Sequence, residues 1–131
     1  MSDGRTDTSI WPGLTYDDAH AARQWLVALG FTEGTVIPGE RDGEIHHSEM
    51  VWPEGGRVMV SSSGGTDPAF DTGKGGVSCY VVTADPDAVY ARATDHGADI
   101  VRELRDEDYG SRGFSIKDAE GNRWSFGTYA G

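Results

Sequence analysis

The segment Glu54-Gly55-Gly56-Arg57-Val58-Met59-Val60-Ser61 recurs later in the chain as Glu120-Gly121-Asn122-Arg123-Trp124-Ser125-Phe126-Gly127. Each copy has a glycine-containing turn followed by an alternating, strand-like run. Upstream of each copy lies an alanine-rich, helix-like stretch of equal length, at residues 18–30 and 85–97. Because the two sets lie about one half-chain apart, the sequence predicts two copies of one module, strand–helix–three strands, that can close around a shared cleft.

The expected elements of the two modules give an α+β fold. Asp17 or Asp18 is placed to cap the first helix and Asp85 the second, with Gly30 and Gly97 ending them. Strands are expected at residues 10–16, 34–38, 45–52 and 57–63 in the first module, and at 77–82, 99–105, 112–117 and 123–129 in the second.

The domain organisation follows from the same pattern. Residues 1–8 are polar and are expected to form a disordered tail. Residues 9–131 are expected to form a single domain, with modules at 9–63 and 77–129 joined by a glycine-rich connector at 64–76.

The net charge of the chain limits the classes of partner that we expect it to bind. Asp and Glu number 22 against 11 Lys and Arg, a formal net charge of −11. Nucleic acids and anionic membrane surfaces both reward basic patches, so neither is an expected partner. No apolar run is long enough to span a membrane and no signal peptide is recognisable, so we expect a cytoplasmic protein. The single cysteine, Cys79, lies in an apolar run and is expected to be a buried, inert thiol.

Alternation along the strands separates a core face from a cleft face. The expected core side chains are Phe114, Ile116, Trp124 and Phe126 in the last hairpin and Met50, Trp52, Val58 and Val60 in the first module. The expected cleft side chains are His47, Glu49, Met59 and Ser61 in the first module and Ser78, Tyr80, Ser115 and Ser125 in the second.

The chain resembles the vicinal oxygen chelate superfamily. The resemblance lies in the two βαβββ modules, in Tyr109-Gly110 with Arg112, and in the run from Asp118 to Thr128, and it extends over nearly the whole chain. That superfamily contains glyoxalase I, extradiol dioxygenases, fosfomycin-resistance transferases and bleomycin-resistance proteins. The resemblance implies the glyoxalase/bleomycin-resistance fold, which hosts unrelated chemistries.

Metal-using members of that superfamily place His or carboxylate ligands at four strand positions that face the cleft. Carried onto this chain, these positions are Trp11, Met59, Ser78 and Ser125. None of these residue types is a usual ligand for a hard divalent cation. We therefore expect neither a metal nor another cofactor.

Two chemical readings remain open. His47 and Glu49 lie two apart on one strand, so they share a face within reach of a shared ligand. They could act as a base or bind a metal, although two protein ligands alone make a poor metal site, or they could form a hydrogen-bonded pair. Trp11 and Tyr80 on the cleft side, with Tyr109 and Phe70 in loops, form an aromatic set that suits a large planar or amphipathic ligand, although some of these rings could instead pack against a dimer partner.

The preferred interpretation is a homodimeric protein that sequesters a bulky aromatic natural product or antibiotic, as bleomycin-resistance proteins do, without metal or turnover. The alternative is a glyoxalase-like lyase or isomerase that uses His47 and Glu49, so enzymatic activity is left undecided. The sequence also leaves open whether modules pair within one chain or between chains. The expected ligand-binding residues are Trp11, His47, Glu49, Met59, Ser61, Phe70, Tyr80, Tyr109, Ser115 and Ser125.

Overall fold

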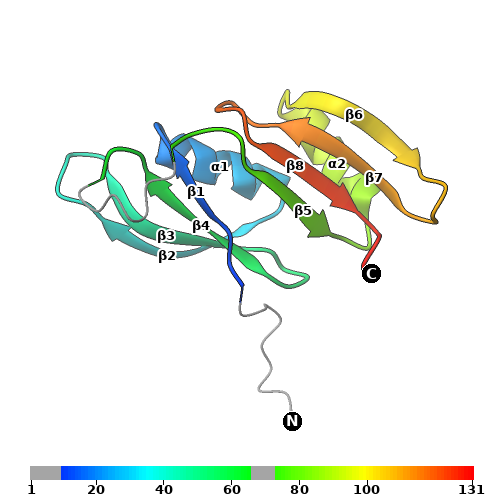
Figure 1. Cartoon of the computed structure of the whole chain (residues 1–131), viewed down its shortest axis with the longest axis horizontal. Helices are drawn as coiled ribbons and strands as arrows, with labels where there is room; N and C mark the ends of the chain where they lie inside the picture. Colours follow the sequence, from blue (N-terminus) through cyan, green and yellow to red (C-terminus); the bar gives the residue numbers. More distant parts are fainter. Residues whose placement is uncertain (1–9, 66–72) are drawn as a thin grey trace, which may run out of the picture. The chain divides into compact units, whose positions relative to one another are not determined.

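The computed structural model describes residues 10–65 and 73–131. The predicted tail and Phe70 lie outside these residues. The chain divides into two compact units, Met1–Lys74 and Gly75–Gly131. Each unit contains one strand, one helix and three further strands, which confirms the predicted α+β fold built from two βαβββ modules. Figure 1 shows the same sequence of elements in each unit.

The first unit is a four-stranded sheet with one helix. Its elements are β1 (Gly13–Tyr16), α1 (Ala19–Leu29), β2 (Thr32–Pro38), β3 (Ile45–Val51) and β4 (Arg57–Ser62). The strand order is β1-β4-β3-β2, with β1 parallel to β4 and the other neighbours antiparallel. The helix α1 covers one face of this sheet (Figure 1).

The second unit repeats this topology. Its elements are β5 (Ser78–Val82), α2 (Pro86–Asp95), β6 (Asp99–Asp106), β7 (Arg112–Lys117) and β8 (Arg123–Gly127). The strand order is β5-β8-β7-β6, and the only parallel pair among these four strands is β5 with β8. The helix α2 packs on one face of this sheet, so each sheet has one covered face and one open face.

Both helices begin at the expected residues. Asp18 accepts a hydrogen bond from the Ala21 backbone N–H at 3.0 Å, and Asp85 accepts one from Ala88 at 3.1 Å. The second helix also has a proline, Pro86, in its first turn, where the missing N–H costs nothing. Gly30 ends α1 with φ 123°, a conformation that favours glycine.

The covered faces hold the core that alternation predicts. Met50, Trp52, Val58 and Val60 are buried in the first unit, as are Phe114, Ile116, Trp124 and Phe126 in the second. Phe31 packs against Trp52 with ring centroids 4.8 Å apart, and Phe114 stacks on Phe126 at 5.4 Å. The pairing of β7 with β8 aligns Phe114 with Phe126 and Ile116 with Trp124.

Several predicted strand limits are wrong by two or three residues. The first strand begins at Gly13, not at residue 10, and the last ends at Gly127, not at residue 129. The strand expected at 34–38 begins at Thr32. In the sheet, β2 has one extra residue between Glu33 and Val36, because Glu33 faces Met50 while Val36 faces Ser48. Such a bulge interrupts the alternation on which the boundary prediction depended.

No helix in residues 10–65 and 73–131 is long and apolar enough to cross a membrane.

Candidate functional site

The open face of the first sheet carries the residues that alternation assigned to it. His47 and Glu49 on β3 and Met59 and Ser61 on β4 are partly exposed, while their strand neighbours Ser48, Met50, Val58 and Val60 are buried. The register pairs Glu49 directly with Met59. The predicted residues of this unit therefore share one face, except for Phe70, which is not described.

A row of polar contacts runs across this face. The Nε2 atom of His47 lies 2.8 Å from Oε2 of Glu49, and Arg57 donates from Nη1 to Oε1 of the same carboxylate at 2.6 Å. The guanidinium carbon of Arg57 lies 4.7 Å from the ring centroid of Trp11. These contacts join four residues in the order Trp11, Arg57, Glu49 and His47.

The surroundings of Glu49 keep it ionised. Hydrogen bonds from His47 and from Arg57, followed by their charges, lower the pKa of the carboxyl, and partial burial opposes them without reversing the shift. A carboxylate held in this way is a weak base. It serves better as an anchor that orients His47 and Arg57 than as a group that exchanges protons near neutral pH.

Sequence reasoning missed two arginines that contact Glu49, Arg57 on the open face and Arg23 on the helix that covers the other face. Arg57 belongs to the quoted repeat, and its side chain lies on the same face as Glu49 and Met59, so the alternation could have included it. Arg23 is only 3% exposed and donates to the Glu49 backbone carbonyl at 3.2 Å and to Oε1 of Glu33 at 3.3 Å. Its position on α1, four residues after the buried Ala19, was the available signal.

The open face of the second sheet is of a different kind. Ser115 on β7 pairs with Ser125 on β8, and their Oγ atoms lie 2.7 Å apart. Ser125 also faces Tyr80 on β5. These residues occupy places equivalent to Glu49, Met59 and Gly13 in the first sheet, where Glu49 faces Met59 and Met59 faces Gly13. Two hydroxyls thus stand where the first unit has a carboxylate and a thioether, and the Tyr80 ring stands where the first unit has Gly13.

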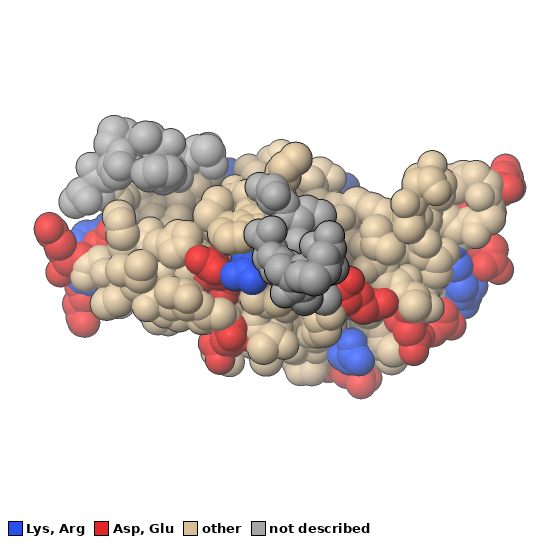
Figure 2. Space-filling view, turned by 90° about the horizontal axis from the view of Figure 1, so that it is seen from below, with Lys and Arg blue, Asp and Glu red and all other residues tan. Residues whose placement is uncertain are grey.

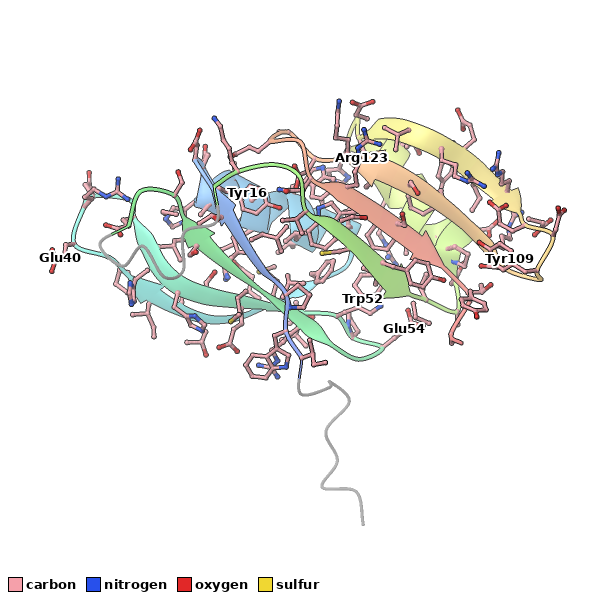
Figure 3. All side chains as sticks on the ribbon, in the orientation of Figure 1. Tyr16, Glu40, Trp52, Glu54, Tyr109 and Arg123 are labelled. Carbon is pink, nitrogen blue, oxygen red and sulfur yellow. The ribbon has the colours of Figure 1, made fainter. Side chains whose placement is uncertain are left out.

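Three tyrosines gather at one end of this second face. Tyr80 donates from its hydroxyl to the Tyr129 backbone carbonyl at 2.7 Å. The rings of Tyr109 and Tyr129 meet edge to face, with centroids 5.6 Å apart and planes at 85°. Figure 3 labels Tyr109 at this end of the unit and Arg123 at the opposite end of β8. Sequence reasoning named Tyr80 and Tyr109 but missed Tyr129, which it had placed within a strand. We call Tyr80, Tyr109 and Tyr129 the tyrosine cluster.

The resemblance described above implies metal-ligand positions at Trp11, Met59, Ser78 and Ser125. The register makes these positions equivalent in the two units, because Gly13 faces Met59, Tyr80 faces Ser125, and Trp11 and Ser78 each lie two residues before the first member of these pairs. An indole, a thioether and two hydroxyls do not fit a hard divalent cation. In residues 10–65 and 73–131, no group of three or more His, Cys, Asp or Glu is arranged to hold a metal ion elsewhere.

Cys79 matches the expectation of a structural thiol. It is buried and free, and burial, helped by the charge of Asp118, raises the pKa of its thiol. A thiol that resists deprotonation is a poor nucleophile.

Comparison with known proteins decides the family. Residues 10–126 match the Glyoxalase/Bleomycin resistance protein/Dioxygenase superfamily. The chain belongs to this superfamily. Among its relatives, the uncharacterized protein Mb0911c of Mycobacterium bovis is 31% identical over 135 residues, an alignment that covers 92% of this chain and 83% of that protein.

Two solved structures are similar to this superfamily member over most of its length. TioX from Micromonospora sp. ML1 is 32% identical, with a TM-score of 0.77 over 94% of this chain and 99% of TioX. A bleomycin-binding protein complexed with bleomycin has a TM-score of 0.64 over 94% of this chain and 99% of its own, at 16% identity. The second likeness establishes a shared fold, and the first also extends to the sequence.

Proposed function

We propose that this superfamily member is a small-molecule binding protein that sequesters a bulky aromatic or amphipathic natural product without converting it. The observation that carries the proposal is the set of residues at the family's metal positions. Trp11, Met59, Ser78 and Ser125 offer ring, thioether and hydroxyl surfaces, which favour binding by stacking and hydrogen bonds over metal-assisted chemistry.

The open faces support this proposal. Trp11 and the three tyrosines are all partly exposed, and an exposed aromatic ring on a sheet face is a ready surface for a flat ligand. Ser115 and Ser125 add small neutral groups that can hydrogen-bond to a ligand edge. A superfamily member that is complexed with bleomycin provides a precedent for ligand binding on this fold.

The net charge of the chain also indicates which ligand charge is preferred. Acidic side chains are spread over the face drawn in Figure 2, with few Lys and Arg among them, and the whole chain carries −11. This field favours neutral or cationic ligands over anionic ones. In this proposal the protein acts in the cytoplasm as a homodimer, with nucleic acids and membranes excluded as partners.

The proposal is tested by titrating the protein with bleomycin and with a panel of aromatic antibiotics, followed by tryptophan fluorescence and calorimetry. We expect saturable binding of at least one compound with a fixed number of sites per chain. Cells that express the protein should also tolerate more of that compound than cells carrying the empty vector. Absence of saturable binding across the panel, together with unchanged tolerance, would contradict the proposal.

A second candidate function is supported by one contact. His47 and Glu49 lie within hydrogen-bond distance, which is the arrangement of a base and the group that orients it in many lyases and isomerases. Arg57 weakens this candidate, because it occupies the other oxygen of Glu49. If the protein converts a bound compound, His47→Gln should abolish the conversion while leaving the binding of that compound measurable.

A further inference from the structure

The three rings of the tyrosine cluster are exposed, unlike the aromatic rings of the two cores. The exposed fractions of Tyr80, Tyr109 and Tyr129 are 50%, 67% and 51%, so all three large rings remain accessible although they lie next to one another. Grouped exposed aromatic residues on a small acidic protein are unusual unless something binds them. The sequence-based prediction grouped Tyr80 and Tyr109 with Trp11 and Phe70 in one aromatic set and did not include Tyr129.

Gly127 lets the ring of Tyr80 lie close to the backbone of β8. An added Cβ at Gly127 would lie 2.9 Å from the hydroxyl oxygen and 3.3 Å from a ring carbon of Tyr80. The Tyr80 ring therefore lies against the backbone of β8, and its hydroxyl reaches the Tyr129 carbonyl. This contact uses the polar end of Tyr80 and leaves ring surface exposed to solvent.

The other two rings are also held in place. The backbone N–H of Tyr129 donates to Oγ of the buried Ser111 at 3.2 Å, and the preceding residue, Thr128, bonds to both backbone groups of Arg112. Tyr109 follows β6 in a turn closed by a hydrogen bond from Gly110 to Glu107. Two rings at 85° form a corner, in which a flat ring stacked on one tyrosine meets the edge of the other.

The charges around this corner favour a cation. Tyrosine faces are electron-rich and attract cations within about 6 Å of the ring centroid. In the same turn, Glu107 is engaged by Arg102 and Arg105, and Asp106 by Arg112. Asp108, directly before Tyr109, is exposed and makes no ion pair within residues 10–65 and 73–131, so its charge is not neutralised locally.

We propose that the tyrosine cluster, with Asp108, is a binding site for a planar cationic ring, such as a protonated or N-alkylated heteroaromatic group of a larger molecule. This inference rests on the proposed function and specifies its ligand class. The rings supply stacking and cation–π attraction, and the carboxylate supplies the counter-charge.

The test uses three probes on the full chain: N-methylacridinium, its neutral isostere acridine at mildly alkaline pH, and tetramethylammonium. Fluorescence titration and calorimetry measure each dissociation constant. We expect N-methylacridinium to bind most tightly, because it combines a flat ring with a positive charge. Equal affinity for acridine and N-methylacridinium would overturn the cationic class, and absence of N-methylacridinium binding would overturn the site.

Substitutions test whether N-methylacridinium binds at the tyrosine cluster. Tyr109→Leu and Tyr129→Leu remove exposed rings without opening the core, and each should weaken N-methylacridinium binding by about fivefold or more. Asp108→Asn should weaken binding of N-methylacridinium and leave acridine unaffected. The matched control is Tyr90→Phe, because Tyr90 lies on α2 outside the cluster and bonds Glu103. Unchanged affinity in both leucine variants, with the control also unchanged, would place the binding elsewhere and refute the proposal.

Failure of this inference can be separated from failure of the proposed function. If compounds of the antibiotic panel bind but none is affected by Tyr109→Leu or Tyr129→Leu, sequestration stands and the tyrosine site is refuted. If neither the panel nor N-methylacridinium binds, both are refuted.

Discussion

At Glu49, one carboxylate takes hydrogen bonds from two side chains on the same sheet face. His47 contacts Oε2 and Arg57 contacts Oε1, and these hydrogen bonds hold the carboxyl pKa below its ordinary range. Because the pKa is lower in the folded than in the unfolded state, ionised Glu49 stabilises the fold above the ordinary glutamate pKa. That contribution is lost as the pH falls through the folded-state pKa.

Glu49→Gln should therefore lower stability near neutral pH, and the difference from the wild type should shrink on acidification. Urea unfolding of both proteins across a pH series measures it. Glu40→Gln is the matched control, because the Glu40 side chain is exposed. A difference between Glu49→Gln and the wild type that stays constant down to acidic pH would contradict the role of the two hydrogen bonds.

Trp11 is the ring that the proposed function expects to contact the ligand on the first sheet. It is 37% exposed and rests against Arg57, so its removal costs little packing. Trp11→Ala should weaken binding of the panel compound that titrates by at least several-fold, while the melting temperature stays nearly unchanged. Trp11→Phe should keep most of the affinity. Equal binding by the alanine variant would remove Trp11 from the site.

Ser125 should matter less than Trp11. Its hydroxyl pairs with Ser115, and Ser125→Ala removes one neutral hydrogen bond worth about 0.5–1.5 kcal/mol. The same titration should show a smaller loss of affinity than in Trp11→Ala. A larger loss would indicate that the serine pair, and not the indole, is the main contact.

At the scale of elements, the turn between β7 and β8 is fixed by one buried aspartate. Asp118 accepts from the backbone N–H groups of Glu120 and Asn122 and from the side chains of Asn122 and Trp124. Gly121, at φ 96°, allows the chain to reverse.

Asp118→Ala should destabilise the protein by about 3 kcal/mol, because several buried donors lose one charged acceptor together. Urea denaturation measures the change. Asp99→Ala is the control, since its pair with Lys117 is exposed and 3.7 Å long, and surface pairs contribute about 0–1 kcal/mol. Comparable losses in the two variants would show that the turn is not held by Asp118.

The elements that could be predicted from the sequence are those fixed by local chemistry. Asp18, Asp85 and Pro86 identify the helix starts, and the repeat identifies the topology. The bulge in β2 could not be predicted, because β2 is an edge strand with exposed side chains, where either alternation is tolerated. Two contacts could not be predicted in this way. Arg57 contacts Trp11 and Glu49, and Tyr129 lies against Tyr109. Both contacts depend on how strands and loops pack in three dimensions, which the alternation pattern does not specify.

At the scale of the whole molecule, one face of each sheet lacks a helix. Exposed aromatic and apolar side chains on such faces favour association with another module, in the same chain or in a second copy. We expect a homodimer in solution at micromolar concentration, measured by size-exclusion chromatography with light scattering. A monomeric mass across the concentration range would contradict the dimer.

In the proposed function, the protein holds its ligand and does not convert it. The most direct measurement is mass spectrometry of a panel compound that titrates, after long incubation of many equivalents with the protein. We predict that all of the compound is recovered unchanged, with the protein-bound amount equal to the number of binding sites. Conversion of many equivalents into a new species would contradict the account and would move His47 and Glu49 to the centre of the mechanism.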